Sequence, residues 1–208
     1  MIDTKQRILD TAERLIGEHG YAATSLRNII SEAGVNLAAV HYHFGSKEDL
    51  LDEVISRKAS AVNTERLALL DRFEAEAGER PVAVEKIVTA FFEPMIERGA
   101  LNPQFVRLMG RIYAEGLLPA IVAKHFQPTL ARFAQALRRS VPYLPEGELS
   151  SRFQFMIGAM SHAVCAERHL PVEGTNNAAT PDFRTNMRRL IVFLCGGLQA
   201  PATPEVQR

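Results

Sequence analysis

The sequence of 208 residues predicts an all-α protein with two helical domains. Three observations support this fold class. Apolar residues recur at helical spacing along most of the chain, glycines and prolines fall mainly between these periodic segments, and no block of alternating apolar and polar residues indicates a β-sheet. We expect a three-helix N-terminal domain over residues 1–60, a C-terminal helical domain over residues 61–196 and a disordered tail over residues 197–208.

The segment TSLRNIISEAGVNLAAVHYHFGSKEDL, which begins at Thr24, has the pattern of a helix-turn-helix, with the motif at about 25–44. Its first helix has apolar residues on one face, at Leu26, Ile29, Ile30 and Ala33. Thr24 stands where the N-cap of this helix belongs, and Gly34 can end the helix in the left-handed conformation. Asn36 is a suitable N-cap for a second helix over residues 37–44.

The second helix of this motif has an unusual outward face. Its inward residues are Val40 and Phe44, four positions apart, and the remaining positions are Leu37, Ala38, Ala39, His41, Tyr42 and His43. A solvated helix rarely has such a surface, whereas a short helix in the major groove of DNA needs one. Ser46, with Asp49 three residues later, starts a long helix at Lys47. The Lys47 ammonium and the free N–H groups at this helix start can hold a phosphate.

Residues 5–60 resemble the DNA-binding domain of the TetR family of bacterial transcriptional regulators. The resemblance rests on Gly20-Tyr21, Thr24-Ser25-Leu26, Ala33-Gly34-Val35 and Tyr42-His43-Phe44-Gly45-Ser46-Lys47-Glu48. It implies that Tyr42 and Lys47 touch phosphates, and that base edges or the backbone are approached by Ala38, Ala39, His41 and His43. The full set of expected DNA contacts is Thr24, Ser25, Arg27, Asn36, Leu37, Ala38, Ala39, His41, Tyr42, His43 and Lys47. His41 departs from the Tyr or Asn of many relatives, which leaves the base preference there open.

The run NLAAVHYHFGSK is also similar to a subgroup of the family in which some members respond to fatty acids or acyl-CoA thioesters.

Net charge limits the affinity that we expect for DNA. The whole chain has 24 basic and 24 acidic residues, and residues 1–60 have seven basic against nine acidic. Because phosphate neutralisation supplies most non-specific affinity, one such domain should bind DNA weakly. We therefore expect useful binding only from a dimer.

The remaining periodic segments predict helices over residues 3–19, 47–77, 81–98, 103–115, 119–140, 146–169 and 182–195. Gly78 should end the second of these helices. Pro94 lacks an N–H group, so we expect a kink or an early end in the third. No stretch approaches the ~18 apolar residues of a membrane span, and the N-terminus has no signal-peptide core. The two cysteines, Cys165 and Cys195, form no disulfide framework, so the chain is expected to be cytoplasmic.

Aromatic and methionine side chains gather in the C-terminal domain. The residues concerned are Phe91, Phe92, Met95, Phe105, Met109, Tyr113, Phe126, Phe133, Phe155, Met156 and Met160. An ordinary core would explain them, and so would an apolar effector pocket; the family resemblance favours the pocket. His162 completes the predicted pocket. Together with Arg107, Arg111 and Tyr113, it is a candidate to meet a polar or anionic head group of the effector. The alternative is that these side chains are simply solvated or paired.

The last two predicted helices have apolar stripes that fit a dimer interface. The expected contacts are Phe153, Ile157, Val164, Met187, Leu190, Ile191 and Leu194. Small residues beside the large ones allow helices to approach closely, and a two-fold dimer would build a four-helix interface. Packing of the same stripes within one chain is the alternative, but the family resemblance favours the dimer. Such a dimer would space two recognition helices by roughly one DNA turn, ~34–36 Å, and implies a palindromic operator.

The sequence also contains residues that could serve metal or redox chemistry. His162, Cys165 and His169 share a helix face and could bind zinc or sense oxidants, although a buried thiol with two hydrogen-bonded histidines is favoured. His41 and His43 diverge on a helix and form no metal site. No hydrolase, nucleotide-binding or zinc-protease motif occurs, so we expect no catalytic residue and no cofactor. The expected function is therefore that of a repressor that binds a palindromic operator as a homodimer. A small apolar or amphipathic effector would release it from the DNA. The alternatives are a helical scaffold, an orphan regulator without an effector and, least favoured, a small-molecule enzyme.

Overall fold

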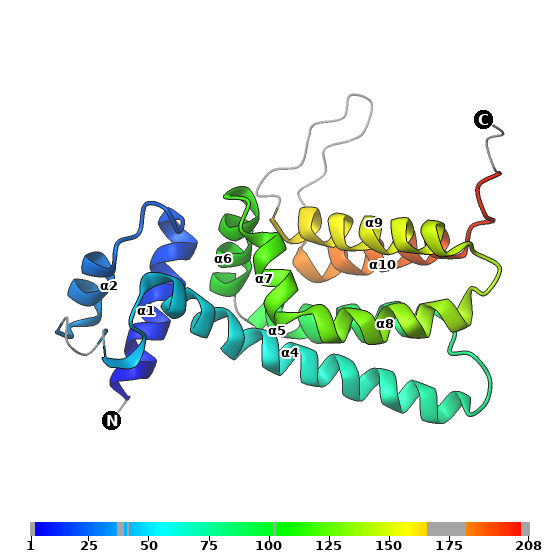
Figure 1. The fold of residues 1–208 in the computed structure, drawn as a ribbon, viewed down its shortest axis with the longest axis horizontal. Helices are drawn as coiled ribbons and strands as arrows, with labels where there is room; N and C mark the ends of the chain where they lie inside the picture. The colour runs from blue at the N-terminus through cyan, green and yellow to red at the C-terminus, as the bar shows by residue number, and fades with distance from the viewer. Residues whose placement is uncertain (1–2, 37–39, 41, 102, 166–181, 205–208) are drawn as a thin grey trace. The chain divides into compact units, whose positions relative to one another are not determined.

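The structure is a computed structural model that describes residues 3–36, 40, 42–101, 103–165 and 182–204 (Figure 1). Within these residues it contains no strand and nine bounded helices: α1 (Thr4–His19), α2 (Leu26–Ala33), α4 (Lys47–Ala77), α5 (Val84–Leu101), α6 (Pro103–Ala114), α7 (Leu118–His125), α8 (Gln127–Ser140), α9 (Glu146–Cys165) and α10 (Phe183–Gln199). The predicted all-α fold class is confirmed.

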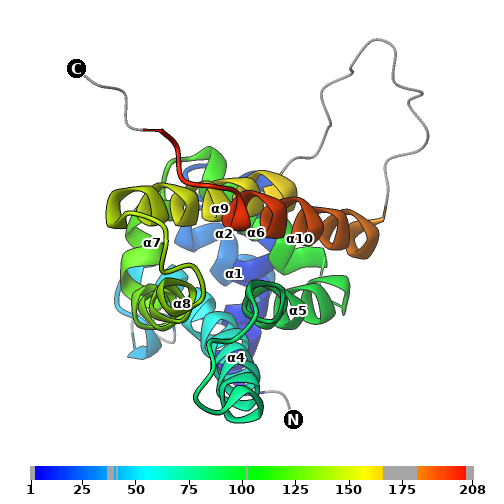
Figure 2. The same ribbon diagram turned by 90° about the vertical axis from the view of Figure 1, so that its right-hand side faces the viewer.

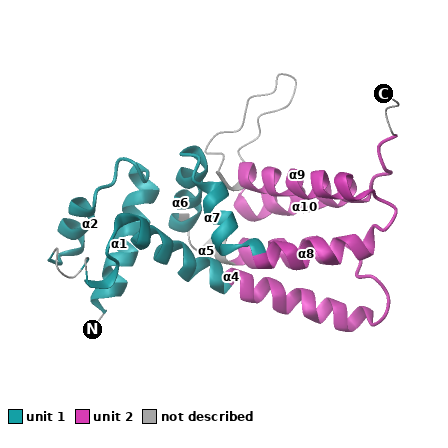
Figure 3. Ribbon diagram, viewed as in Figure 1, with its two compact units in different colours: residues 1–61, 101–127 teal, residues 62–100, 128–208 magenta. Residues whose placement is uncertain are grey.

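The chain forms two compact units (Figure 3). Unit 1 consists of residues 1–61 and 101–127, and unit 2 consists of residues 62–100 and 128–208. The units differ from the expected domains because α6 and α7 belong to unit 1, where α6 packs along α1. Gly17 lies at this contact, where an added Cβ atom would be 3.4 Å from the Gln104 carbonyl oxygen and the Leu108 backbone nitrogen of α6, an ordinary van der Waals distance.

The core of unit 1 joins α1, α2, the first part of α4 and α6. Its fully buried side chains include Ile8, Ile16, Ile29, Val40, Leu50, Val54, Ile55, Leu108 and Ile112. An ionic cluster accompanies this core, since the buried carboxylate of Glu13 lies 2.7 Å from Arg57 Nη2 and 3.4 Å from Lys58 Nζ. Asp52 joins α4 to α7 through Lys124 Nζ and His125 Nε2, both at 2.8 Å. Apolar packing and charged pairs therefore hold these helices together.

The core of unit 2 is built around phenylalanines from α5 and α8. The Phe91 ring meets the Phe92 and Phe133 rings edge-on, with centroids 5.4 and 5.1 Å apart, and all three are almost fully buried. Helices α9 and α10 lie side by side and cover α5 and α8 on one side (Figure 2). Arg132 of α8 binds both carboxylate oxygens of Glu74 on α4, at 3.1 and 2.7 Å.

Two differences from the predicted helices lie at prolines. The predicted single helix over residues 119–140 is wrong, because α7 ends at His125 and α8 starts at Gln127. Pro128 lacks an N–H group and is tolerated in the first turn of a helix but not inside one, so a new helix begins beside it. By contrast, α5 continues through Pro94 to Leu101, and the predicted early end does not occur. Three residues before Pro94, the carbonyl of Phe91 accepts a hydrogen bond from Arg66 Nε at 2.7 Å.

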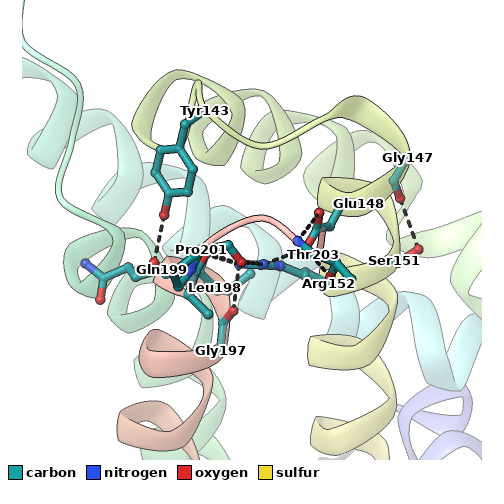
Figure 4. A network of polar contacts seen from close by, with 11 residues as sticks. Tyr143, Gly147, Glu148, Ser151, Arg152, Gly197, Leu198, Gln199, Pro201 and Thr203 are labelled. Atoms are coloured by element: carbon teal, nitrogen blue, oxygen red, sulfur yellow. Dashed lines mark hydrogen bonds and ion pairs between the residues drawn. The ribbon is translucent and has the colours of Figure 1, made fainter. Parts of the chain in front are cut away.

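The C-terminal segment contradicts the predicted disordered tail over the residues described (Figure 4). Residues 197–199 lie in α10, and Arg152 Nη1 donates to the carbonyls of Gly197, Leu198 and Ala200 at 3.0, 3.2 and 2.7 Å. Glu148 in turn accepts from the backbone N–H of Thr203 at 3.0 Å. These contacts satisfy carbonyls that a helix end leaves without partners, which composition alone does not reveal. Residues 205–208 lie outside the described residues.

Replacement of Arg152 by Ala is expected to destabilise the protein by about 1–3 kcal/mol, because several carbonyls and the carboxylate of Glu148 lose a charged donor that is only 11% exposed. Urea unfolding at a fixed protein concentration measures this change. Arg80→Ala, which removes an exposed arginine of unit 2, is the matched control and should stay within about 0.5 kcal/mol of the parent. Equal unfolding midpoints for the two variants would contradict a structural role for the Arg152 contacts.

Candidate nucleic-acid interface

The start of α2 is fixed by a reciprocal cap. Ser25 Oγ accepts from the Asn28 N–H at 3.1 Å, and the Asn28 side-chain oxygen accepts from the Ser25 N–H at 3.2 Å. The prediction that Thr24 is the N-cap is therefore wrong by one residue. Thr24 is 2% exposed, and its hydroxyl group faces the carbonyls of Gly20 and Leu15 at 2.7 and 3.2 Å. This buried position also removes Thr24 from the predicted DNA contacts.

The turn after α2 has the geometry predicted for a helix-turn-helix. Gly34 adopts φ 61° and ψ 40°, the left-handed conformation that ends a helix. Val40 and Phe44 are buried, and the Phe44 N–H donates to the Val40 carbonyl at 2.9 Å, which is a helical bond. The predicted inward pair is thus confirmed. The expected contacts Leu37, Ala38, Ala39 and His41 lie outside the described residues.

An aromatic side chain protrudes from the described part of this motif. Tyr42 is 85% exposed, and its ring meets the half-buried His43 ring edge-on at 5.1 Å. Ser25, Arg27 and Asn36 are also exposed. A tyrosine so exposed gains little from packing, but its hydroxyl group can donate to a phosphate oxygen.

The start of α4 positions Lys47. Ser46 Oγ accepts from the Asp49 N–H at 3.0 Å, so the predicted capping interaction is confirmed. Lys47 Nζ donates to the carbonyl of Tyr21 at 2.5 Å and lies 4.0 Å from the centroid of the Tyr21 ring. An ammonium group has three donors, so these contacts orient Lys47 and leave it able to bind a phosphate as well.

Tyr21 is itself held from two sides. Its hydroxyl group donates to Glu48 Oε1 at 2.9 Å. The carboxylate of Glu115, which follows α6, accepts from the backbone N–H groups of Tyr21 and Ala22 at 2.8 and 2.9 Å. Burial and then the neighbouring Glu48 and Glu115 raise the pKa of Tyr21 to about 12, so its hydroxyl group stays protonated. Sequence reasoning missed Glu115, because no local pattern relates it to a turn 94 residues earlier.

The acidic residues of unit 1 are largely paired. Glu32 binds Arg14 at 2.7 Å, and Asp10 binds Arg57 at 2.8 Å. Residues 101–127 add three basic residues against one acidic residue, which offsets the charge of minus two over residues 1–60. Unit 1 is therefore formally neutral, and its repulsion from DNA is weaker than the N-terminal segment alone suggested.

Comparison with known families agrees with this geometry. Residues 8–54 match the family model described as "Bacterial regulatory proteins, tetR family", and residues 86–197 match the one described as "Tetracyclin repressor-like, C-terminal domain". The chain belongs to the TetR family. The members of this family that match the chain are transcriptional regulators and not enzymes.

Several TetR-family regulators are similar in sequence. BetI from Rhizobium meliloti is 34% identical over 126 residues, which cover 54% of this chain and 60% of BetI. AcrR from Shigella flexneri is 35% identical over 74 residues, covering 36% of this chain and 34% of AcrR. The nicotine-responsive repressor HdnoR from Paenarthrobacter nicotinovorans is 44% identical over 50 residues, covering 24% and 26%. The matched part thus spans less than two thirds of each of these relatives.

Solved TetR-family structures share the fold over nearly the whole chain. The fatty acid degradation regulator FadR from Bacillus halodurans superposes with a TM-score of 0.65 at 17% identity, covering 96% of this chain and 98% of FadR. PfmR from Thermus thermophilus superposes with a TM-score of 0.62 at 20% identity, covering 97% and 100%. At these identities the likeness establishes the TetR fold.

The residues predicted for a TetR-type effector pocket do not form one cluster. Phe91, Phe92, Phe133 and Met156 are buried in the core of unit 2, and Met95 and Met160 pack against it. Phe105, Met109 and Phe126 instead pack against the core of unit 1. Tyr113, Phe155 and His162 are exposed, as is the head-group candidate Arg107, and Arg111 donates to the Glu18 carbonyl at 3.2 Å. The spacing of these residues correctly predicts helices. It does not determine whether a given helix face packs against the core of unit 1 or that of unit 2.

The predicted dimer residues are also divided. Phe153, Met187 and Leu194 are buried in the core of unit 2, so for these three the alternative of packing within one chain holds. Ile157, Leu190 and Ile191 are partly buried, and the side chain of Val164 lies outside the described residues. Among the described side chains of α9 and α10, the large apolar ones left exposed are Phe155, Val192 and Phe193, at 70, 74 and 73%.

The structure adds little to the metal hypothesis. The side chain of Cys165 and all of His169 lie outside the described residues. Within the part that is described, no group of three His, Cys, Asp or Glu residues could hold a metal ion. In the same part of the chain, no helix is long and apolar enough to cross a membrane.

Replacement of Gly20 by Ala tests the Glu115 contact. Gly20 has φ +93°, and a Cβ atom there would meet Glu115 Oε1 at 2.3 Å. We expect a loss of stability on the order of 1–3 kcal/mol from the backbone strain, and a further loss from displacing the carboxylate. Gly116→Ala is the control, because Gly116 also has a positive φ, +72°, but open space around the added atom. If both variants unfold at the same urea concentration, the close contact with Glu115 has no energetic effect.

Proposed function

We propose that this TetR-family regulator is a ligand-responsive repressor that binds a palindromic operator as a homodimer. The observation that carries the proposal is the helix-turn-helix of unit 1. It combines a capped α2, a left-handed turn at Gly34, an inward Val40–Phe44 pair and an exposed Tyr42. This arrangement fits a helix-turn-helix that enters the major groove, with the phosphate donors Tyr42 and Lys47 beside it.

The exposed apolar surface of α9 and α10 supports the homodimer. Phe155, Val192 and Phe193 are large apolar side chains that would lose contact with water in an interface. Gly158 and Gly196 lie among them, and a Cβ atom at either would meet nothing within 4 Å, so a second pair of helices can approach closely. A two-fold pairing of α9 and α10 would therefore build a four-helix interface.

A buried arginine in unit 2 supports an effector with an anionic head group. Arg66 is 3% exposed and contacts the Phe91 carbonyl at 2.7 Å, the Phe91 ring at 4.0 Å from its centroid and Asn63 Oδ1 at 3.5 Å. Among the described residues no carboxylate pairs with it, and burial lowers the pKa of Arg66 to about 9. A buried cation without a counter-charge is costly, and an apolar anion would supply that charge. The relative HdnoR is named as nicotine-responsive, which supports a small-molecule effector but not its charge.

A salt titration of binding to DNA from immediately upstream of the protein's own gene tests the DNA-binding part of the proposal. Arg27→Ala and Lys47→Ala should each weaken binding and lower the magnitude of the salt slope by about 1 per lost phosphate contact. The proposal fails if specific binding is absent at low salt and neither replacement has an effect.

Thermal unfolding with ligands tests the effector part. The ligands are a panel of acyl thioesters, aromatic compounds and drugs, together with dodecanoic acid and dodecanol. These last two have chains of the same length and differ in the charge of the head group. We expect the acid to raise the unfolding midpoint more than the alcohol, and Arg66→Met to abolish that difference. A flat response to every compound would favour an orphan regulator or a helical scaffold without an effector.

A further inference from the structure

We propose that Glu115 is a positioning residue for DNA binding, acting on the phosphate contact of Lys47 through Tyr21. The inference rests on the proposed operator binding and assigns one function to contacts within unit 1. Glu115 touches no expected DNA contact itself. Its two carboxylate oxygens hold two successive backbone N–H groups of the turn between α1 and α2, those of Tyr21 and Ala22.

The first step of the coupling is the rigid placement of Tyr21. Bonds from one carboxylate to two adjacent N–H groups fix the orientation of that peptide segment, and such charge-assisted bonds are stronger than neutral ones. Gly20 permits the approach, because any Cβ atom at that position would overlap Glu115 Oε1. The bond from the Tyr21 hydroxyl group to Glu48 at 2.9 Å fixes the other end of the side chain.

The second step is the placement of the Lys47 ammonium. The carbonyl and the ring of Tyr21 both contact Lys47 Nζ. A lysine side chain has considerable rotamer entropy, and holding it in place before DNA binds reduces the entropy lost on binding. Loosening the turn at Tyr21 would therefore weaken the phosphate contact without removing any group that touches DNA.

The sign of the expected effect separates this proposal from simple electrostatics. Removing a negative charge from a DNA-binding protein ordinarily strengthens its attraction to phosphates. We expect Glu115→Gln to do the opposite, because an amide accepts one N–H bond and places its own NH₂ group against the other donor. The predicted loss of affinity for the upstream duplex is about fivefold, the effect of roughly one hydrogen bond.

The control variant is Glu53→Gln, which removes the same charge from an exposed ion pair with Lys5 elsewhere in unit 1. It should bind the duplex as tightly as the parent or more tightly. Fluorescence anisotropy across a range of salt concentrations gives both affinities and salt slopes, and circular dichroism shows whether each variant is folded. Glu115→Asp, which keeps a carboxylate, serves where Glu115→Gln does not fold and should retain part of the affinity. Equal or tighter binding by a folded Glu115→Gln variant overturns the proposal.

A double-mutant cycle with Lys47→Met tests the route through Lys47. If Glu115 acts on that contact, the double variant binds no more weakly than Lys47→Met alone. Additive losses would show that Glu115 acts elsewhere, which contradicts the proposal. The outcome for operator binding is separate. If the parent does not recognise the upstream duplex, the proposed operator binding fails. A parent that binds and a Lys47→Met variant that binds weakly support operator binding whatever Glu115 does.

Discussion

Replacing Phe193 by Lys is expected to yield a monomer whose affinity for the upstream operator is lower by about 100-fold or more, because two linked DNA-binding units gain that much over one. Phe193 is 73% exposed on α10, and a charged ammonium group there would have to be desolvated in a dimer interface. Sedimentation velocity reports the oligomeric state, and anisotropy reports the affinity.

The control for this replacement is Gln135→Lys, which adds the same charge at an exposed position of α8. It should remain dimeric and bind DNA at least as well as the parent, because added positive charge favours phosphates. A Phe193→Lys variant that stays dimeric at micromolar concentration would place the interface somewhere other than the exposed face of α9 and α10.

Phe133→Ala is expected to cost about 3–5 kcal/mol of unfolding free energy, the usual range for truncating a buried phenylalanine. Phe133 is 0% exposed and packs edge-on against Phe91, so the deletion leaves a cavity in the middle of unit 2. Urea unfolding at a fixed protein concentration measures the loss. Gln135→Ala, on the exposed side of the same helix, should stay within about 0.5 kcal/mol of the parent; similar losses for both would mean that α8 is not anchored by Phe133.

Local signals in the sequence predicted the helix-turn-helix well. Gly34, the Val40–Phe44 pair and the Ser46 cap depend on neighbours within about four residues, and each was found as expected. The error at Thr24 has the same scale, because Thr and Ser are both good N-caps and either could stand first. Burial decided between them, and burial is a tertiary property.

Contacts between distant segments could not be predicted in the same way. Periodicity correctly places Phe153 and Phe155 on different faces of α9, but it does not say which face meets the core of the same chain. The structure buries Phe153 and exposes Phe155, the reverse of their predicted roles. Likewise, nothing near Glu115 or Arg152 in the sequence indicates that these side chains hold backbone groups 93 and 48 residues away.

The most direct test of the central claim is a hydroxyl-radical footprint of the protein on DNA upstream of its own gene, combined with the stoichiometry of the complex. The claim is that two copies, joined through α9 and α10, present two helix-turn-helix motifs to one operator. It predicts two protected half-sites related by two-fold symmetry, with centres about one helical turn, ~34–36 Å, apart, and loss of both with Phe193→Lys. A single protected half-site that Phe193→Lys binds as tightly as the parent would contradict it.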